Sequence, residues 1–117
     1  LRVGVLRNYY RFRYKAHNPF YVKGCNMAFW RKDLIAVNGY NEDMPGWGRE
    51  DSEVAARLIN SGIRRQFIKF GGVEFHIYHP FNDREREPIN SGIFEKAVAD
   101  KATGCENGWN KYWGSGK

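Results

Sequence analysis

Residues 46–51 combine two glycines around Trp47 with two adjacent carboxylates, Glu50 and Asp51. Flat aromatic rings stack on sugars and bases, and flanking glycines make such a loop mobile. Glu50 and Asp51 precede Val54 by four and three residues, so both lie at the top of the face that an apolar helix would bury. A carboxylate held there can take a proton from a hydroxyl group. A purely structural role is the alternative, because acidic residues are common in first helical turns and Trp47 could be a core residue.

A second candidate site is the pair His76 and His79, which is followed by Pro80. Residues three apart on a strand face opposite sides, so the two imidazoles converge only if the strand ends near Ile77. Pro80 favours such an end, because it keeps His79 extended and cannot donate to a ladder. Two imidazoles could then share a divalent metal ion. The sequence has no Asp-x-Asp pair to complete the shell, and two histidines without a ligand role are the alternative.

Several other sites are excluded by spacing. The cysteines Cys25 and Cys105 form no zinc-ligand pattern with the histidines, and no Gly-x-Ser-x-Gly elbow or phosphate-binding loop is present. Two distant cysteines are typical of free thiols in a reducing compartment. The basic and aromatic residues at 7–15 could bind single-stranded nucleic acid or form a protected edge strand.

The elements that must position these residues follow from periodicity and breakers. We expect strands at 10–15, 22–30, 64–70 and 73–78, and helices at 31–37, 49–60 and 89–103, with a short final turn within 105–113. Gly39 and Gly62 are suited to end the first two helices. This mixture predicts an α/β or α+β fold class.

The composition supports one folded domain. The chain has 117 residues, of which 42% are hydrophobic and 16% aromatic, enough for a packed core, so we expect a single domain over residues 1–117. The net charge of +6 is uneven, because residues 1–32 hold eight basic residues and no Asp or Glu. An anion-binding surface and a solvated basic face both fit this pattern. No apolar run is long enough for a transmembrane helix. The start at Leu1 suggests an excised piece of a longer protein.

Taken in order, the motifs between residues 22 and 90 resemble one family. They are similar to the C-terminal half of a GT-A-type inverting glycosyltransferase, of family 2 and the β-1,4-galactosyltransferase-like C-terminal region, including chondroitin-polymerase-like modules. The element Trp-Gly-x-Glu-Asp with a downstream His is specific as a set. The motifs are Gly24-Cys25-Asn26-Met27-Ala28-Phe29, Arg31, Asn38-Gly39-Tyr40, Gly46-Trp47-Gly48-Arg49-Glu50-Asp51, Arg57-Leu58, Gly62, His79 and Arg86-Glu87-Pro88-Ile89-Asn90.

The resemblance implies catalytic roles for the acidic pair and its loop. Asp51 matches the general base that deprotonates the acceptor hydroxyl, and Glu50 matches the residue that contacts sugar hydroxyls. Trp47, with Gly48 beside it, matches the part of the loop that lines the donor and acceptor site.

The resemblance also implies further substrate and metal contacts. Gly24 and Asn26 match the segment that flanks the sugars, and Arg86 lies in the loop that closes over the donor. His79 matches a manganese ligand. His76 stands where galactosyltransferase-like members carry a Met ligand, which leaves its role open.

The implied function is metal-dependent transfer, with inversion, of a hexose or N-acetylhexosamine, galactose among them, from a UDP-sugar to a carbohydrate acceptor. The fold would be the C-terminal portion of a GT-A transferase domain. Mn²⁺ or Mg²⁺ would take further ligands from an Asp-x-Asp motif in an N-terminal half of the same enzyme, so we expect the isolated chain to be inactive. We expect no nucleic-acid partner, and a bacterial, cytoplasmic enzyme of polysaccharide synthesis at the inner membrane face. The alternative is a non-catalytic carbohydrate- or nucleic-acid-binding module.

Overall fold

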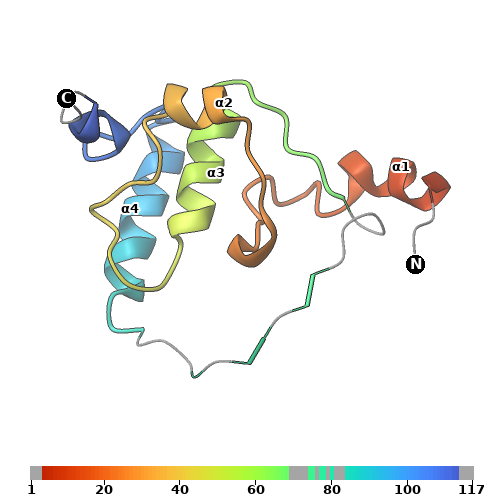
Figure 1. Ribbon diagram of the computed structural model, residues 1–117, viewed down its shortest axis with the longest axis horizontal. Helices are drawn as coiled ribbons and strands as arrows, with labels where there is room; N and C mark the ends of the chain where they lie inside the picture. Colours follow the sequence, from red (N-terminus) through yellow and green to blue (C-terminus); the bar gives the residue numbers. More distant parts are fainter. Residues whose placement is uncertain (1–3, 69–73, 76, 79, 81–83, 114–117) are drawn as a thin grey trace.

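The computed structural model describes residues 4–68, 74–75, 77–78, 80 and 84–113. Helices α3 and α4 lie side by side, α2 lies across one end of them, and α1 stands apart at the far end of the molecule (Figure 1). The described part of the chain contains no β-strand. The elements are α1 (Gly4–Arg13), η1 (Gly24–Asn26), α2 (Arg31–Ala36), α3 (Glu50–Asn60), α4 (Glu87–Ala99) and η2 (Trp109–Tyr112).

The core forms between α3 and the end of α2. Val54 and Leu58, which are one helical turn apart on α3, are buried against Val37. Three partly buried residues pack around this cluster: Met27, Phe29 and Leu34. The apolar stripe predicted for the helix at 49–60 is therefore confirmed, and the helix predicted at 31–37 is confirmed as α2.

An ion pair is buried beside this apolar cluster. The Arg57 side chain is 0% exposed and that of Glu53 is 2% exposed. The guanidinium donates to both carboxylate oxygens of Glu53 at 2.8 and 2.7 Å. It also donates to the backbone carbonyls of Val37 and Gly39, the latter at 2.8 Å. One side chain thus joins α3 to the turn that follows α2.

The turn after α2 has the geometry that its residues predict. Asn38 and Gly39 adopt the left-handed conformation, with φ angles of 66° and 74°, and the Gly39 N–H donates to the Leu34 carbonyl at 2.8 Å. Gly62 ends α3 in the same conformation, with a φ of 87°. Both helix ends expected from glycine are confirmed.

The strand predicted at residues 10–15 is wrong, because these residues continue or follow helix α1. An alternation over only six residues is too short to exclude a helix. Residues 64–67 contact the C-terminal end of α1. The Phe67 N–H donates to the Arg11 carbonyl at 3.0 Å, and the Arg64 guanidinium lies 4.3 Å from the Phe12 ring centre.

The strand predicted at residues 22–30 is also wrong, since the chain makes the short turn η1 there. Of the two strands predicted over 64–70 and 73–78, residues 64–68, 74–75 and 77–78 are not in a strand, and the others lie outside the described residues. The α/β or α+β class stays a prediction.

Among the described residues, no helix combines the length and the apolar character that crossing a membrane requires.

Breaking the buried ion pair tests what holds α3 in place. We expect Arg57→Met to lower the free energy of unfolding by about 3–5 kcal/mol, because it leaves the Glu53 charge and two carbonyls buried without their donor. Urea unfolding measures this change. The control is Lys96→Met, which removes the exposed Lys96–Asp100 pair on α4 and should leave the midpoint unchanged. Equal stability of both variants would contradict this assignment.

Candidate functional site

Asp51 lies half-buried in the first turn of α3, against the turn η1. A Cβ atom added at Gly24 would overlap the Asp51 carboxylate, so only glycine allows this approach. The Gly24 backbone also hydrogen-bonds to the carboxylate. The prediction that Gly24 contributes to the site is thus consistent with its direct contact with Asp51.

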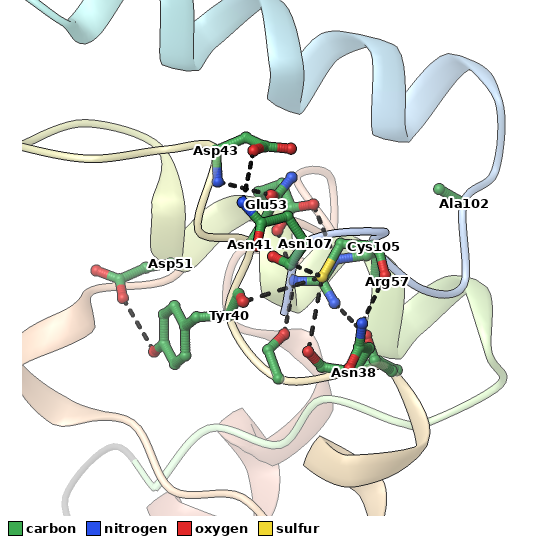
Figure 2. Close-up of polar contacts among 12 residues, drawn as sticks. Asn38, Tyr40, Asn41, Asp43, Asp51, Glu53, Arg57, Ala102, Cys105 and Asn107 are labelled. Carbon is green, nitrogen blue, oxygen red and sulfur yellow. Dashed lines mark hydrogen bonds and ion pairs between the residues drawn. The ribbon is translucent and has the colours of Figure 1, made fainter. Parts of the chain in front are cut away.

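A second contact to Asp51 comes from Tyr40, on the loop after α2. The Tyr40 hydroxyl donates to Asp51 Oδ1 at 3.2 Å, and Figure 2 shows the ring directed at the carboxylate. The ring packs edge-on against Phe29, with 6.4 Å between the ring centres. Partial burial, followed by the charge of Asp51, raises the pKa of Tyr40 to about 12. The hydroxyl is therefore protonated at neutral pH and acts as a donor.

The surroundings of Asp51 make it a stronger base than an exposed aspartate. Burial, and next the negative charge of Glu50, raise the pKa of Asp51 above its ordinary value. The hydrogen bonds from Tyr40 and Gly24 act in the opposite direction and favour the ionised form. A carboxylate whose pKa is raised binds a proton more strongly than an exposed aspartate, which suits it to accept a proton from a hydroxyl group.

Glu50 lies beside Asp51 and also contacts the loop that contains Trp47. Its Oε2 accepts a hydrogen bond from the Gly48 N–H at 2.8 Å. Arg49, between the loop and the helix, has a φ of 66°, so the chain turns sharply just before α3 begins. The adjacent carboxylates of Glu50 and Asp51 therefore serve two different segments, the glycine loop and η1.

The Trp47 loop lies on the start of α4. Gly46 and Gly48 have φ angles of 82° and 122°, and a Cβ atom on Gly48 would lie 3.3 Å from atoms of Glu87. A Cβ atom on Gly46 would lie 3.5 Å from the Arg86 side chain. The Trp47 ring is 37% exposed, which leaves part of it accessible. Both glycines are needed for the turn and for this packing.

The exposed Trp47 ring has a cationic neighbour. The Arg84 guanidinium lies 4.3 Å from the ring centre, within the range of a cation–π contact. The ring and the guanidinium together present a flat, positively charged surface on the loop before α3.

An open cleft of about 580 Å³ lies on another side of the start of α3. It runs between residues 18–22 and α4, and Arg49 and Ser52, which flank Asp51 in the sequence, line its wall. Phe20 and Phe94 pack edge-on within it, with 6.1 Å between their ring centres. Its volume lies in the range of small-molecule sites.

The structure brings most of the predicted site residues around the first turns of α3 and α4. Gly24 meets Asp51, Glu50 meets Gly48, and Arg86 lies beside the Trp47 loop. Asn26 is exposed in the same turn as Gly24. These positions are consistent with the predicted roles, which stay predictions.

The predicted metal ligands His76 and His79 lie outside the described residues. Within the part of the chain that the structure describes, no three or more His, Cys, Asp or Glu side chains gather in a way that could hold a metal ion. The metal site stays a prediction.

Two residues of this site were not predicted from chemistry or spacing. Tyr40 reaches Asp51 across 11 residues, and Arg84 reaches Trp47 from a charged loop far along the chain. No helical or strand period links either pair. The position of Tyr40 directly after the Asn38-Gly39 helix end was the available signal, because such a stop reverses the chain towards the next helix.

Comparisons with known proteins point to one kind of enzyme. A family model described as the N-terminal domain of galactosyltransferase matches residues 4–80. The chondroitin sulfate synthase 3 proteins of Homo sapiens and Mus musculus are each 34% identical to the chain over 53 residues, which is 45% of this chain. The match spans 6% of the length of these relatives. No solved structure shows a significant match.

The contact between Gly24 and Asp51 can be tested by adding one methyl group. We expect Gly24→Ala to displace the carboxylate or η1 and to cost about 1–3 kcal/mol of stability, because the new Cβ atom overlaps a partly buried group. Thermal unfolding and the carbon chemical shift of the Asp51 carboxyl report these effects. The matched control is Gly92→Ala on α4, where a Cβ atom meets nothing within 4 Å. An undisturbed Asp51 signal in Gly24→Ala would rule out the contact.

Proposed function

Because the chain belongs to the galactosyltransferase family, as the match over residues 4–80 shows, we propose that it transfers a hexose or N-acetylhexosamine from a UDP-sugar to a carbohydrate hydroxyl, with inversion. The observation that carries this proposal is the Asp51 carboxylate, which is half-buried, held by two hydrogen bonds and of raised pKa. Family membership supports the transferase class. The donor, the acceptor and the stereochemistry are proposals.

In the proposed reaction Asp51 is the general base. An acceptor hydroxyl placed against the carboxylate gives its proton to Asp51 while its oxygen forms a bond to the anomeric carbon of the donor. The bond from that carbon to the diphosphate breaks, and the electron pair leaves with the UDP. Because the attacking and leaving oxygens lie on opposite faces, one displacement inverts the configuration and needs no covalent enzyme intermediate.

The neighbouring residues supply contacts for the sugars. The exposed face of Trp47 offers a stacking surface, and Glu50 and Gly48, which are joined to each other, hold the loop at the start of α3. Arg86 adds a positive charge beside this loop, suited to the donor diphosphate. Gly24 and Asn26 in η1 would flank the sugar on the Asp51 side.

The cleft at the start of α3 suggests where the rest of the acceptor lies. Its wall carries Arg49 and Ser52 as polar groups and two phenylalanine rings, a mixture that suits sugar hydroxyls and ring faces. A non-catalytic carbohydrate-binding module is the second candidate, and the exposed Trp47 ring under Arg84 favours it. Turnover distinguishes the two functions, because both predict sugar binding.

Metal dependence is part of the proposal. Mn²⁺ or Mg²⁺, when bound, would offset the charge that develops on the leaving diphosphate. His79, with His76 as a further candidate, would be its ligands on this chain.

The place of the chain in the cell and in its enzyme is also proposed. We propose that it forms the acceptor and metal side of a GT-A-type domain, working with an N-terminal nucleotide-binding half in the cytoplasm, peripherally at the inner membrane face. Reading the sequence that adjoins residues 1–117 tests this placement, because a nucleotide-binding half that ends in an Asp-x-Asp motif should precede them.

Replacing the proposed base tests the central claim. In the full-length protein we expect Asp51→Asn to lower kcat by roughly 10²–10⁴-fold while binding of the UDP-sugar is retained, because the amide keeps the shape but cannot take the proton. A donor screen followed by steady-state kinetics and donor titration measures this. The matched control is Asp100→Asn at the exposed end of α4, which should keep full activity. Full activity of Asp51→Asn would reject the base role.

The same variant separates folding from catalysis. The pKa of Asp51 is raised in the folded protein, so the ionised carboxylate makes folding less favourable at pH values above that pKa. Replacing it by a neutral amide should therefore leave the melting temperature at pH 7 unchanged or higher. A marked loss of stability would show that the carboxylate has a structural role instead.

Removing the metal ion tests the cofactor. We expect EDTA to abolish sugar transfer and Mn²⁺ or Mg²⁺ to restore it, and His79→Ala to weaken the restoration by raising the metal concentration required. Metal titrations of the activity measure both effects. Undiminished transfer after exhaustive chelation would contradict metal dependence.

A further inference from the structure

Residues 105–112, here called the C-terminal strap, bind the loop 38–43 along its whole length. Side chains join the two segments in several places, among them Asn107 Nδ2 to Asp43 Oδ1 at 2.8 Å and the Tyr112 hydroxyl to Glu42 at 3.0 Å. Backbone atoms also pair, with the Glu42 N–H donating to the Asn107 carbonyl at 2.9 Å. The strap lies outside residues 4–80, the range that matches the family.

Asn38 is the centre of this contact. Its side-chain amide donates to the Cys105 carbonyl at 2.8 Å and to Asn110 Oδ1 at 3.0 Å, while its Oδ1 accepts the Asn110 N–H at 2.7 Å. Its carbonyl accepts the Trp109 N–H at 2.8 Å. Both ends of the Asn38 side chain and its carbonyl are therefore bound to the strap, and Figure 2 shows Asn38 beside Cys105.

The C-terminal strap lies so close to the loop 38–43 that no side chain fits at Gly108. A Cβ atom on Gly108 would overlap the Asn38 carbonyl oxygen. The Cys105 sulfur lies 3.6 Å from that oxygen and 3.9 Å from the Tyr40 carbonyl oxygen. Burial raises the pKa of the Cys105 thiol, which keeps it a neutral donor towards these carbonyls.

The backbone around Tyr40 is thus contacted from two sides. The strap contacts the residues around it, and Arg57 on α3 holds the Gly39 carbonyl that precedes it. Its side chain is fixed by the Phe29 ring and reaches Asp51 Oδ1. Gly24 lies against the other carboxylate oxygen, so the two contacts together restrict rotation of the carboxylate.

We propose that Tyr40 is a positioning residue for Asp51, and that the C-terminal strap keeps Tyr40 in the orientation that this requires. The inference rests on the proposed base role of Asp51. A carboxylate oxygen has two lone pairs, so Asp51 can accept from Tyr40 and still present a free lone pair to the acceptor hydroxyl. Losing the Tyr40 contact leaves the carboxylate free to rotate and lowers the fraction of productive complexes.

The hydrogen bond has an effect that a packing role alone does not predict. The groups that face Asp51 in the described residues are Tyr40, Glu50 and the Gly24 backbone. Tyr40 favours the ionised carboxylate and Glu50 disfavours it. Removing the Tyr40 hydroxyl should therefore raise the pKa of Asp51, whereas neutralising Glu50 should lower it.

The experiment measures the acidic limb of the pH profile of kcat/KM in the full-length protein. We expect Tyr40→Phe to lower kcat roughly tenfold and to move this limb to higher pH. We expect Glu50→Gln, which keeps the acceptor for the Gly48 N–H, to move it to lower pH. Tyr9→Phe, a hydroxyl deletion on the distant helix α1, is the matched control and should change neither quantity.

The strap is tested by Asn110→Ala, which removes the side-chain contact to Asn38 without touching Tyr40. We expect its acidic limb to move in the direction of Tyr40→Phe, by a smaller amount.

A carbon NMR titration of the Asp51 carboxyl gives the same pKa directions without turnover. An unmoved pKa and an unchanged kcat in Tyr40→Phe would overturn the inference about Tyr40, and an Asn110→Ala that only lowers the melting temperature would overturn the role of the strap. A fully active Asp51→Asn variant would instead overturn the proposed function.

Discussion

The buried pair of Arg57 and Glu53 is the interaction on which the described structure depends. Two charges removed from water are tolerated only when their hydrogen bonds are satisfied, and here the guanidinium serves both carboxylate oxygens and two backbone carbonyls. Those carbonyls belong to Val37 and Gly39, in the turn that reverses the chain after α2. The pair therefore does more than stabilise α3. By binding the turn after α2, it fixes where the chain leaves α2 relative to α3.

The geometry of the candidate site depends on this contact between α3 and the turn after α2. With Gly39 fixed, Tyr40 begins the next loop beside the first turn of α3, and its hydroxyl reaches Asp51. The C-terminal strap closes the other side of the same loop through Asn38. Because the carboxylate is contacted by η1 and by the loop after α2, its orientation is a property of the tertiary structure and not only of the helix that carries it.

Short sequence patterns predicted the structure correctly where it depends on residues that are close together in the chain. The helix at 49–60, the glycine ends of α2 and α3, and the grouping of Glu50 and Asp51 near the buried face all follow from a short period or from one φ angle. The strand predicted at residues 10–15 was wrong because an alternation over only six residues does not exclude a helix, and these residues continue or follow α1. The contacts of Tyr40, Arg84 and the strap could not be predicted, because no local rule relates residues so far apart in the sequence.

The raised pKa of Asp51 explains why the groups that hydrogen-bond to it must be held in place. Burial and the neighbouring Glu50 both disfavour its ionised form, so the carboxylate that suits proton transfer makes folding less favourable at neutral pH. The Gly24 backbone and the Tyr40 hydroxyl recover part of that cost by hydrogen-bonding to the charge. Each of these donors is useful only while its segment stays in place, and the segment of Tyr40 is held by Arg57 and the strap. A half-buried base of raised pKa thus requires rigidity in the loop around it, and here that rigidity comes from a buried ion pair on one side and a C-terminal segment on the other.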